Sequence, residues 1–119
     1  MFTSIRTMLL FALIPVAALA YDVSGKWTFQ VETGAGSGSP TFVFKQAGEK
    51  LTGTYSGTFG TAELTGTVTG DDIQFSFEVS VQDQKGKIVY KGKIDSPDKM
   101  HGNVDLAGLG SGNWTGVKQ

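Results

Sequence analysis

The stretch LTGTYSGTFGTAELTGTVTG, Leu51 to Gly70, alternates residue types with a period of two. Within its opening L-T-G-T-Y, the leucine, glycine and tyrosine share one parity and the threonines share the other. Successive side chains of a β-strand point to opposite faces of the sheet, and β-branched hydroxyl residues suit a face exposed to water. The stretch therefore predicts two neighbouring strands, each with an inward-facing glycine near its middle.

The same alternation recurs along the chain beyond residue 20, and no segment there has a convincing helical period. Eight segments carry it. The residues expected to face inward on them are Trp27, Phe29 and Val31; Phe42 and Phe44; Leu51, Gly53 and Tyr55; Leu64, Gly66 and Val68; Ile73, Phe75, Phe77 and Val79; Ile88, Tyr90, Gly92 and Ile94; Met100, Gly102, Val104 and Leu106; and Gly112, Trp114 and Gly116. The pattern predicts an all-β chain of eight strands.

The connections between these segments fall into two alternating sets. Short ones, with the Gly, Asp and Pro residues of tight hairpins, are 47–49, 70–71 and 96–98. Longer and mostly glycine-rich ones are Thr33–Ser39, Gly57–Thr61, Gln82–Gly86 and Ala107–Ser111. Successive connections of an up-and-down meander lie at alternate ends. We therefore expect short turns to close one end and long loops to frame the other.

The fold class that this pattern favours is an antiparallel, eight-stranded, up-and-down β-barrel. Closure into a barrel removes both edges of the sheet, and inward glycines such as Gly53 and Gly66 permit the strong bend that closure requires. A two-sheet β-sandwich built from the same strands is the alternative.

The first twenty residues have the order of a secretory signal peptide. Arg6 supplies the positive region, an apolar run follows, and Ala18-Leu19-Ala20 provides a small-x-small cleavage site. The run is short for a membrane-spanning helix, and the leader has a bacterial character. We therefore expect residues 1–20 to be removed, leaving residues 21–119 as a single β-barrel domain that is secreted or periplasmic.

Composition narrows the function classes. Residues 21–119 carry nine lysines and eleven acidic residues, a net charge of −2, which disfavours nucleic acid or a membrane surface as a partner. The chain has no cysteine, and its single histidine, His101, shows no spacing to a serine nucleophile. Its carboxylates lack calcium-loop spacing. We expect no enzyme activity, no catalytic residue, no metal site and no cofactor.

A short motif opens the first predicted strand. Gly25-Lys26-Trp27 forms a G-x-W, and together with the eight-strand meander it resembles the calycins, the lipocalin-like and avidin-like barrels. The resemblance implies a barrel with an apolar cup, in which the tryptophan packs across the closed end. Many calycins cover that tryptophan with an arginine near the last strand. The mature chain has no arginine, and Lys118 is the expected replacement.

A barrel of this kind predicts a non-catalytic module that binds a small apolar or aromatic ligand at its open end. The candidate ligand-binding residues are Phe42, Tyr55, Phe59, Phe77, Tyr90, Leu109 and Trp114. The alternative is a structural or interaction domain whose aromatic side chains fill the interior and leave no room for a ligand. A third hypothesis is recognition of an ordered surface by the outward threonines of the opening stretch, although threonine pairs are common in sheets.

Overall fold

A computed structural model of the chain describes residues 21–34, 36–107 and 110–119. The predicted signal peptide lies outside these ranges. Among the described residues, no helix has the length and apolar content needed to span a membrane.

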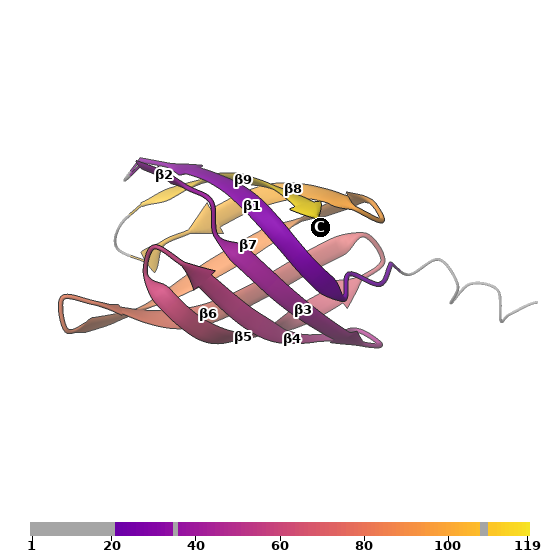
Figure 1. The fold of residues 1–119 in the computed structure, drawn as a ribbon, viewed down its shortest axis with the longest axis horizontal. Helices are drawn as coiled ribbons and strands as arrows, with labels where there is room; N and C mark the ends of the chain where they lie inside the picture. The colour runs from indigo at the N-terminus through magenta and orange to yellow at the C-terminus, as the bar shows by residue number, and fades with distance from the viewer. Residues whose placement is uncertain (1–20, 35, 108–109) are drawn as a thin grey trace, which may run out of the picture.

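The described chain is an all-β barrel (Figure 1). Its strands are β1 (Gly25–Thr33), β2 (Gly36–Gly38), β3 (Thr41–Ala47), β4 (Lys50–Gly57), β5 (Gly60–Thr69), β6 (Asp72–Val81), β7 (Gln84–Ser96), β8 (Lys99–Asp105) and β9 (Ser111–Lys118). They pair in the order β2-β1-β3-β4-β5-β6-β7-β8-β9, and β1 also pairs with β9, which closes the sheet on itself. The prediction of an eight-stranded antiparallel barrel is confirmed, with the short β2 as one extra strand, and the sandwich alternative is excluded.

The short strand β2 continues β3 beyond an interruption at Ser39 and Pro40. Both strands pair with β1 in one register, and the Phe29 amide donates to the Pro40 carbonyl at 3.0 Å in the interrupted part. The predicted long loop Thr33–Ser39 is therefore wrong, because Thr33 of β1 pairs with Gly36 of β2 in a hairpin. Gly36 has a φ of 122°, which a side chain would disfavour.

Two more of the predicted long loops are also tight hairpins. Gly57 pairs with Gly60, and Val81 pairs with Gln84, so each connection leaves only two residues unpaired. In the second turn both central residues, Gln82 and Asp83, have positive φ, as a type I′ hairpin requires. Only the connection from β8 to β9, which follows the Asp105–Ser111 pair, is longer. The two ends of the barrel therefore do not differ in loop length as expected.

The ends differ instead in how each hairpin is joined to the next. At the end that holds the turns β3–β4, β5–β6 and β7–β8, here called the base, a carbonyl in every turn accepts a hydrogen bond from a strand of the neighbouring hairpin. The bonds are Val68 N to Glu49 O at 2.9 Å, Ile94 N to Asp71 O at 2.7 Å and Lys118 N to Asp98 O at 3.0 Å. The base is thus continuous around the barrel.

At the opposite end, here called the mouth, the hairpins separate. The pairing of β5 with β6 stops at Thr65 and Ser76, so residues 60–64 and 77–81 pair only within their own hairpins. The pairing of β7 with β8 begins only at Val89 and Asp105. The outer part of the β6–β7 hairpin consequently projects beyond its neighbours, as Figure 1 shows at the left of the barrel.

Aromatic rings fill the barrel at mid-height. Phe29 stacks on Trp114 with ring centroids 4.5 Å apart, and Phe75 stacks on Tyr90 at 4.9 Å. The inward glycines make room for these rings, since a Cβ built on Gly92 would lie 2.6 Å from Trp114 Cζ2. In this part of the barrel, the interior is packed as the filled-core alternative predicts.

A segment that precedes β1 seals the base. Val23 is buried beneath the barrel, and the Trp27 indole N–H donates to the Val23 carbonyl at 2.9 Å. The Gln46 side chain accepts from Val23 N at 2.9 Å and donates to the Tyr21 carbonyl at 2.8 Å. These hydrogen bonds satisfy polar groups of the sealing segment. They were not predicted from the sequence.

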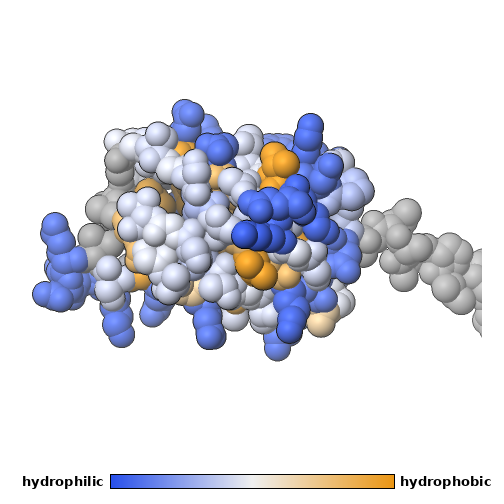
Figure 2. Space-filling view, viewed as in Figure 1, coloured by the Kyte–Doolittle hydropathy of each residue, from blue (hydrophilic) through white to orange (hydrophobic). Residues whose placement is uncertain are grey.

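The outer surface is largely hydrophilic on the face drawn in Figure 2. Val43 and Val117 are the large apolar side chains exposed among the described residues, and they lie on β3 and β9, on either side of β1. The proposed threonine array is interrupted: Thr52 pairs with Thr65, but Thr54 pairs with Glu63 and Thr67 pairs with Lys50.

Candidate ligand-binding site

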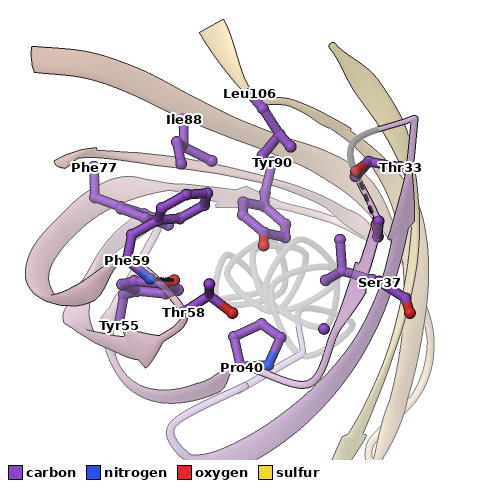
Figure 3. A pocket seen from close by; sticks show the side chains of 13 residues that line it. Thr33, Ser37, Pro40, Tyr55, Thr58, Phe59, Phe77, Ile88, Tyr90 and Leu106 are labelled. Carbon is purple, nitrogen blue, oxygen red and sulfur yellow. Dashed lines mark hydrogen bonds between the residues drawn. The ribbon is translucent and has the colours of Figure 1, made fainter. Parts of the chain in front are cut away.

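A cavity of about 110 Å³ lies at the mouth (Figure 3). Its walls come from β1, β2, β4, the β4–β5 turn, β6, β7 and the residue that follows β8. The lining residues are Val31, Thr33, Gly36, Ser37, Gly38, Pro40, Tyr55, Thr58, Phe59, Phe77, Ile88, Tyr90 and Leu106. None of these side chains is ionisable near neutral pH, so the cavity is uncharged.

One wall is aromatic. Tyr55 and Phe77 stack with ring centroids 4.3 Å apart, and Phe59 packs beside them from the β4–β5 turn. The Phe59 amide donates to the Tyr55 hydroxyl at 3.2 Å, which ties the turn to the wall. A Cβ on Gly57 would lie 2.6 Å from that hydroxyl, so a side chain at this position would force the hydroxyl to shift. Burial raises the pKa of Tyr55, more than the hydrogen bond with Phe59 lowers it.

Tyr90 provides part of the floor. Its ring stacks on Phe75, and the side chain is only 3% exposed. In Figure 3 its hydroxyl points into the space between the lining residues. Burial raises the pKa of Tyr90 well above its ordinary value, so the hydroxyl keeps its proton at neutral and mildly alkaline pH.

The remaining walls are aliphatic side chains and backbone. Val31, Ile88 and Leu106 contribute the apolar surface, and β2 with Pro40 contributes main chain that carries little side chain. Thr33, Ser37 and Thr58 add hydroxyls, of which Thr33 donates to the Gly36 carbonyl at 2.9 Å.

Four of the seven predicted site residues lie on this cavity: Tyr55, Phe59, Phe77 and Tyr90. Phe42 is fully buried below it, with its ring 5.3 Å from that of Tyr90. Trp114 is buried in the core, where its indole N–H donates to the Asn103 carbonyl at 2.9 Å. Leu109 lies outside the described residues. The predicted residues that line the cavity are therefore those that lie nearest the mouth.

The wall formed by β2 was missed. Gly36, Ser37 and Gly38 were assigned to a long loop, and Pro40 and Thr58 were not singled out. The available signal was the alternation of Gly36 and Gly38 with Ser37, which continues the period of two into the glycine-rich stretch.

Charged groups gather on the outer surface, away from the cavity. His101 Nδ1 lies 2.8 Å from Asp95 Oδ2, and both side chains are exposed. A hydrogen bond to Asp72, supported by the charges of Asp71 and Asp72, raises the pKa of Lys93. Within the part of the chain that the structure describes, no cluster of three His, Cys, Asp or Glu residues is arranged to hold a metal ion.

No protein-family model matches the chain, and no curated protein matches it. Among solved structures, the chain is similar to a redesigned β-barrel, at 17% sequence identity and a TM-score of 0.64, over 87% of this chain and 93% of that one. It also aligns with a de novo designed fluorescence-activating β-barrel, at 16% identity and a TM-score of 0.49, over 90% of this chain and 100% of that one. At this identity, the first likeness shows the barrel fold alone.

Proposed function

We propose that the chain is a non-catalytic β-barrel module that binds a small apolar or aromatic ligand in the cavity at its mouth. The single observation that carries the proposal is this uncharged cavity, with aromatic and aliphatic walls, above a core that is otherwise packed. Its volume of about 110 Å³ is somewhat below the roughly 150 Å³ of an apolar cavity that holds benzene. A single ring, with its outer edge in the opening, is the size of ligand that fits.

The absence of catalysis and the export of the chain belong to the same proposal. Among the described residues, the only histidine is paired with a carboxylate on the outer surface, and neither of these two residues lines the cavity. The signal-peptide pattern of residues 1–20 supports a secreted or periplasmic location.

A calycin-like character is also proposed. Trp27 lies at the base, where the tryptophan of the G-x-W motif packs in calycins. Lys118 is its pairing partner on β9, and a Cβ on Gly25 would lie 2.8 Å from Lys118 Cε. A lysine thus passes over the motif in the position where many calycins have an arginine.

Binding is tested by thermal unfolding and native mass spectrometry of residues 21–119 with single-ring compounds such as benzene and toluene. A ligand that binds only the folded state raises the free energy of unfolding, by about 2.7 kcal/mol at a concentration of 100 Kd. We expect Val31→Phe, which fills the cavity, to abolish the shift. Val43→Phe, the same change on the outer face, should leave it intact.

The second candidate function is a structural or interaction domain with no ligand. The observation that favours it is the packing of rings through the barrel below the mouth, for example the Phe29–Trp114 and Phe42–Phe75 pairs. It predicts that no single-ring compound raises the melting temperature and that Val31→Phe and Val43→Phe behave alike in the presence of such compounds.

A further inference from the structure

The Tyr90 hydroxyl is a buried polar group that the fold leaves without a partner. The side chain is 97% buried, and no described residue hydrogen-bonds to its oxygen. Buried polar groups in native proteins nearly always have a partner, and an orphaned one costs about 1–3 kcal/mol. The hydroxyl points into the cavity, so a partner is expected to enter from there.

The ring of Tyr90 is held in place by its neighbours. Its centroid lies 4.9 Å from that of Phe75 and 5.3 Å from that of Phe42, with Phe29 at 5.7 Å. These contacts come from the packed core and fix the direction of the hydroxyl. The donor is therefore positioned before any ligand arrives, which reduces the entropic cost of binding.

The rest of the cavity limits the chemistry of the partner. The lining residues include no Lys, Arg, His, Asp or Glu, so an ionic group on a ligand would be desolvated without a counter-charge. The Tyr55 hydroxyl accepts a hydrogen bond from the Phe59 amide, which holds its oxygen at the β4–β5 turn, so Tyr90 is the hydroxyl donor on the cavity floor. An uncharged ligand with one acceptor atom can accept a hydrogen bond from Tyr90, while the rest of its surface packs against the apolar walls.

We propose that Tyr90 donates a hydrogen bond from its hydroxyl to the ligand, and that the ligand is a neutral, single-ring molecule with one acceptor atom directed at the cavity floor. The acceptor is a ring nitrogen, a carbonyl oxygen or an ether oxygen. This inference rests on the proposed function and specifies which apolar or aromatic molecules the site selects.

Pyridine and benzene provide the test, because they have nearly the same shape and differ in one acceptor nitrogen. Their affinities are measured by NMR titration at pH 8, where pyridine is uncharged, for residues 21–119 and for Tyr90→Phe. We expect Tyr90→Phe to weaken pyridine binding about fivefold, as the loss of one neutral hydrogen bond does, and to change benzene binding less than twofold. Tyr21→Phe, at the base, should change neither.

The outcomes separate the two proposals. If neither compound binds the unmodified chain, the proposed function fails. If both bind and Tyr90→Phe weakens them equally, or weakens neither, the role of Tyr90 is overturned while ligand binding stands.

A second measurement needs no variant. In the chain labelled with ¹³C at tyrosine Cζ, pyridine should shift the resonance of Tyr90 and benzene should shift it far less. An equal response to both compounds would overturn the role of Tyr90, because ring proximity alone would then explain it.

Discussion

The base and the mouth of the barrel are built from the same kind of hairpin, but they differ in how the hairpins bond to one another and in how tightly the interior is packed. At the base, one carbonyl of each turn is bonded to the neighbouring hairpin, and the indole of Trp27 and the amide of Gln46 have partners in the sealing segment. At the mouth, β5 and β6 separate beyond Thr65 and Ser76, and the hydroxyl of Tyr90 faces a cavity. The base is a closed part of the packed core, whereas the mouth contains a cavity.

This difference shows that the length of a turn does not decide whether a barrel end is open. Two-residue connections occur at both ends, as at Gly48-Glu49 and at Thr58-Phe59. What separates the ends is the hydrogen bonding between hairpins and the segment that folds across one of them. The comparison predicts that equivalent changes have large effects on stability at the base and small ones at the mouth.

The largest effect is expected for Trp27→Ala at the base. Trp27 is fully buried. Removal of a buried tryptophan side chain lowers the free energy of unfolding by about 3–5 kcal/mol, because the surrounding residues fill the resulting cavity only in part. Phe59→Ala at the mouth, where the side chain is half-buried, should cost less than about 1.5 kcal/mol, the low end of what burying an apolar side chain contributes. Urea unfolding of both variants measures the contrast, and equal losses would contradict it.

The next effect is expected for Gln46→Ala. Its amide bonds Val23 and Tyr21 to the base, and breaking part-buried hydrogen bonds costs about 1–3 kcal/mol. Limited proteolysis should then cut the released segment near residues 21–24 faster than in the unmodified chain. Gln74→Ala, on an exposed outer position of β6, is the matched control and should leave both stability and cleavage unchanged.

Alkaline pH should destabilise the chain through Tyr90. The folded pKa of Tyr90 is raised above the unfolded value near 10, so the folded state retains a proton that the unfolded state loses. Stability is therefore fully present below pH 10 and falls as the pH rises above it, with a slope of about 1.4 kcal/mol per pH unit from this group. Urea unfolding should show that the free energy of unfolding falls less between pH 9 and pH 11 for Tyr90→Phe than for the unmodified chain. An identical loss in the variant would disagree with the burial of the hydroxyl.

The two tyrosines of the mouth should differ in the ligand-free chain. Tyr55→Phe leaves the Phe59 amide without its acceptor and should cost about 1 kcal/mol. Tyr90→Phe removes a hydroxyl that has no partner among the described residues, so its stability at pH 7 should stay within about 0.5 kcal/mol or rise. Thermal unfolding of both variants measures this, and a marked loss for Tyr90→Phe would indicate a structural hydrogen bond instead.

The smallest effect is expected at acidic pH, at the base. A hydrogen bond from the Ser24 amide, at 2.9 Å, lowers the pKa of the exposed Asp22 carboxyl. Its contribution is present above the unfolded pKa and is lost as the pH falls through the folded value. Asp22→Asn should therefore reduce the decrease in melting temperature between pH 5 and pH 2.5. No difference between the two chains would exclude this contribution.

The strands could be predicted because their evidence is local. Ile73, Phe75 and Phe77 alternate with polar residues, and all three are buried as that alternation requires. The turns could not be predicted as well, since glycine suits a tight hairpin and a long loop equally. Thus the alternation decided the fold, and the glycine-rich stretches left the shape of the mouth undetermined.

The residues of the site could be predicted from the sequence only in part. Tyr55 and Tyr90 were predicted as ligand-binding residues of the open end, and both line the cavity. Phe42 and Trp114 have the same parity but lie in the packed core, and depth of that kind depends on how all the rings fit together. The sealing segment depends on Gln46, more than twenty residues away in the chain, so no local pattern indicates it.

The most direct test of the account is a titration of residues 21–119 with benzene, followed by methyl NMR. Saturable shifts are expected at Val31, Ile88 and Leu106, around the cavity, and almost none at Leu51, Val68 and Met100, toward the sealed base. Shifts spread evenly over both sets, or no saturable shift at any of the three mouth residues, would contradict it.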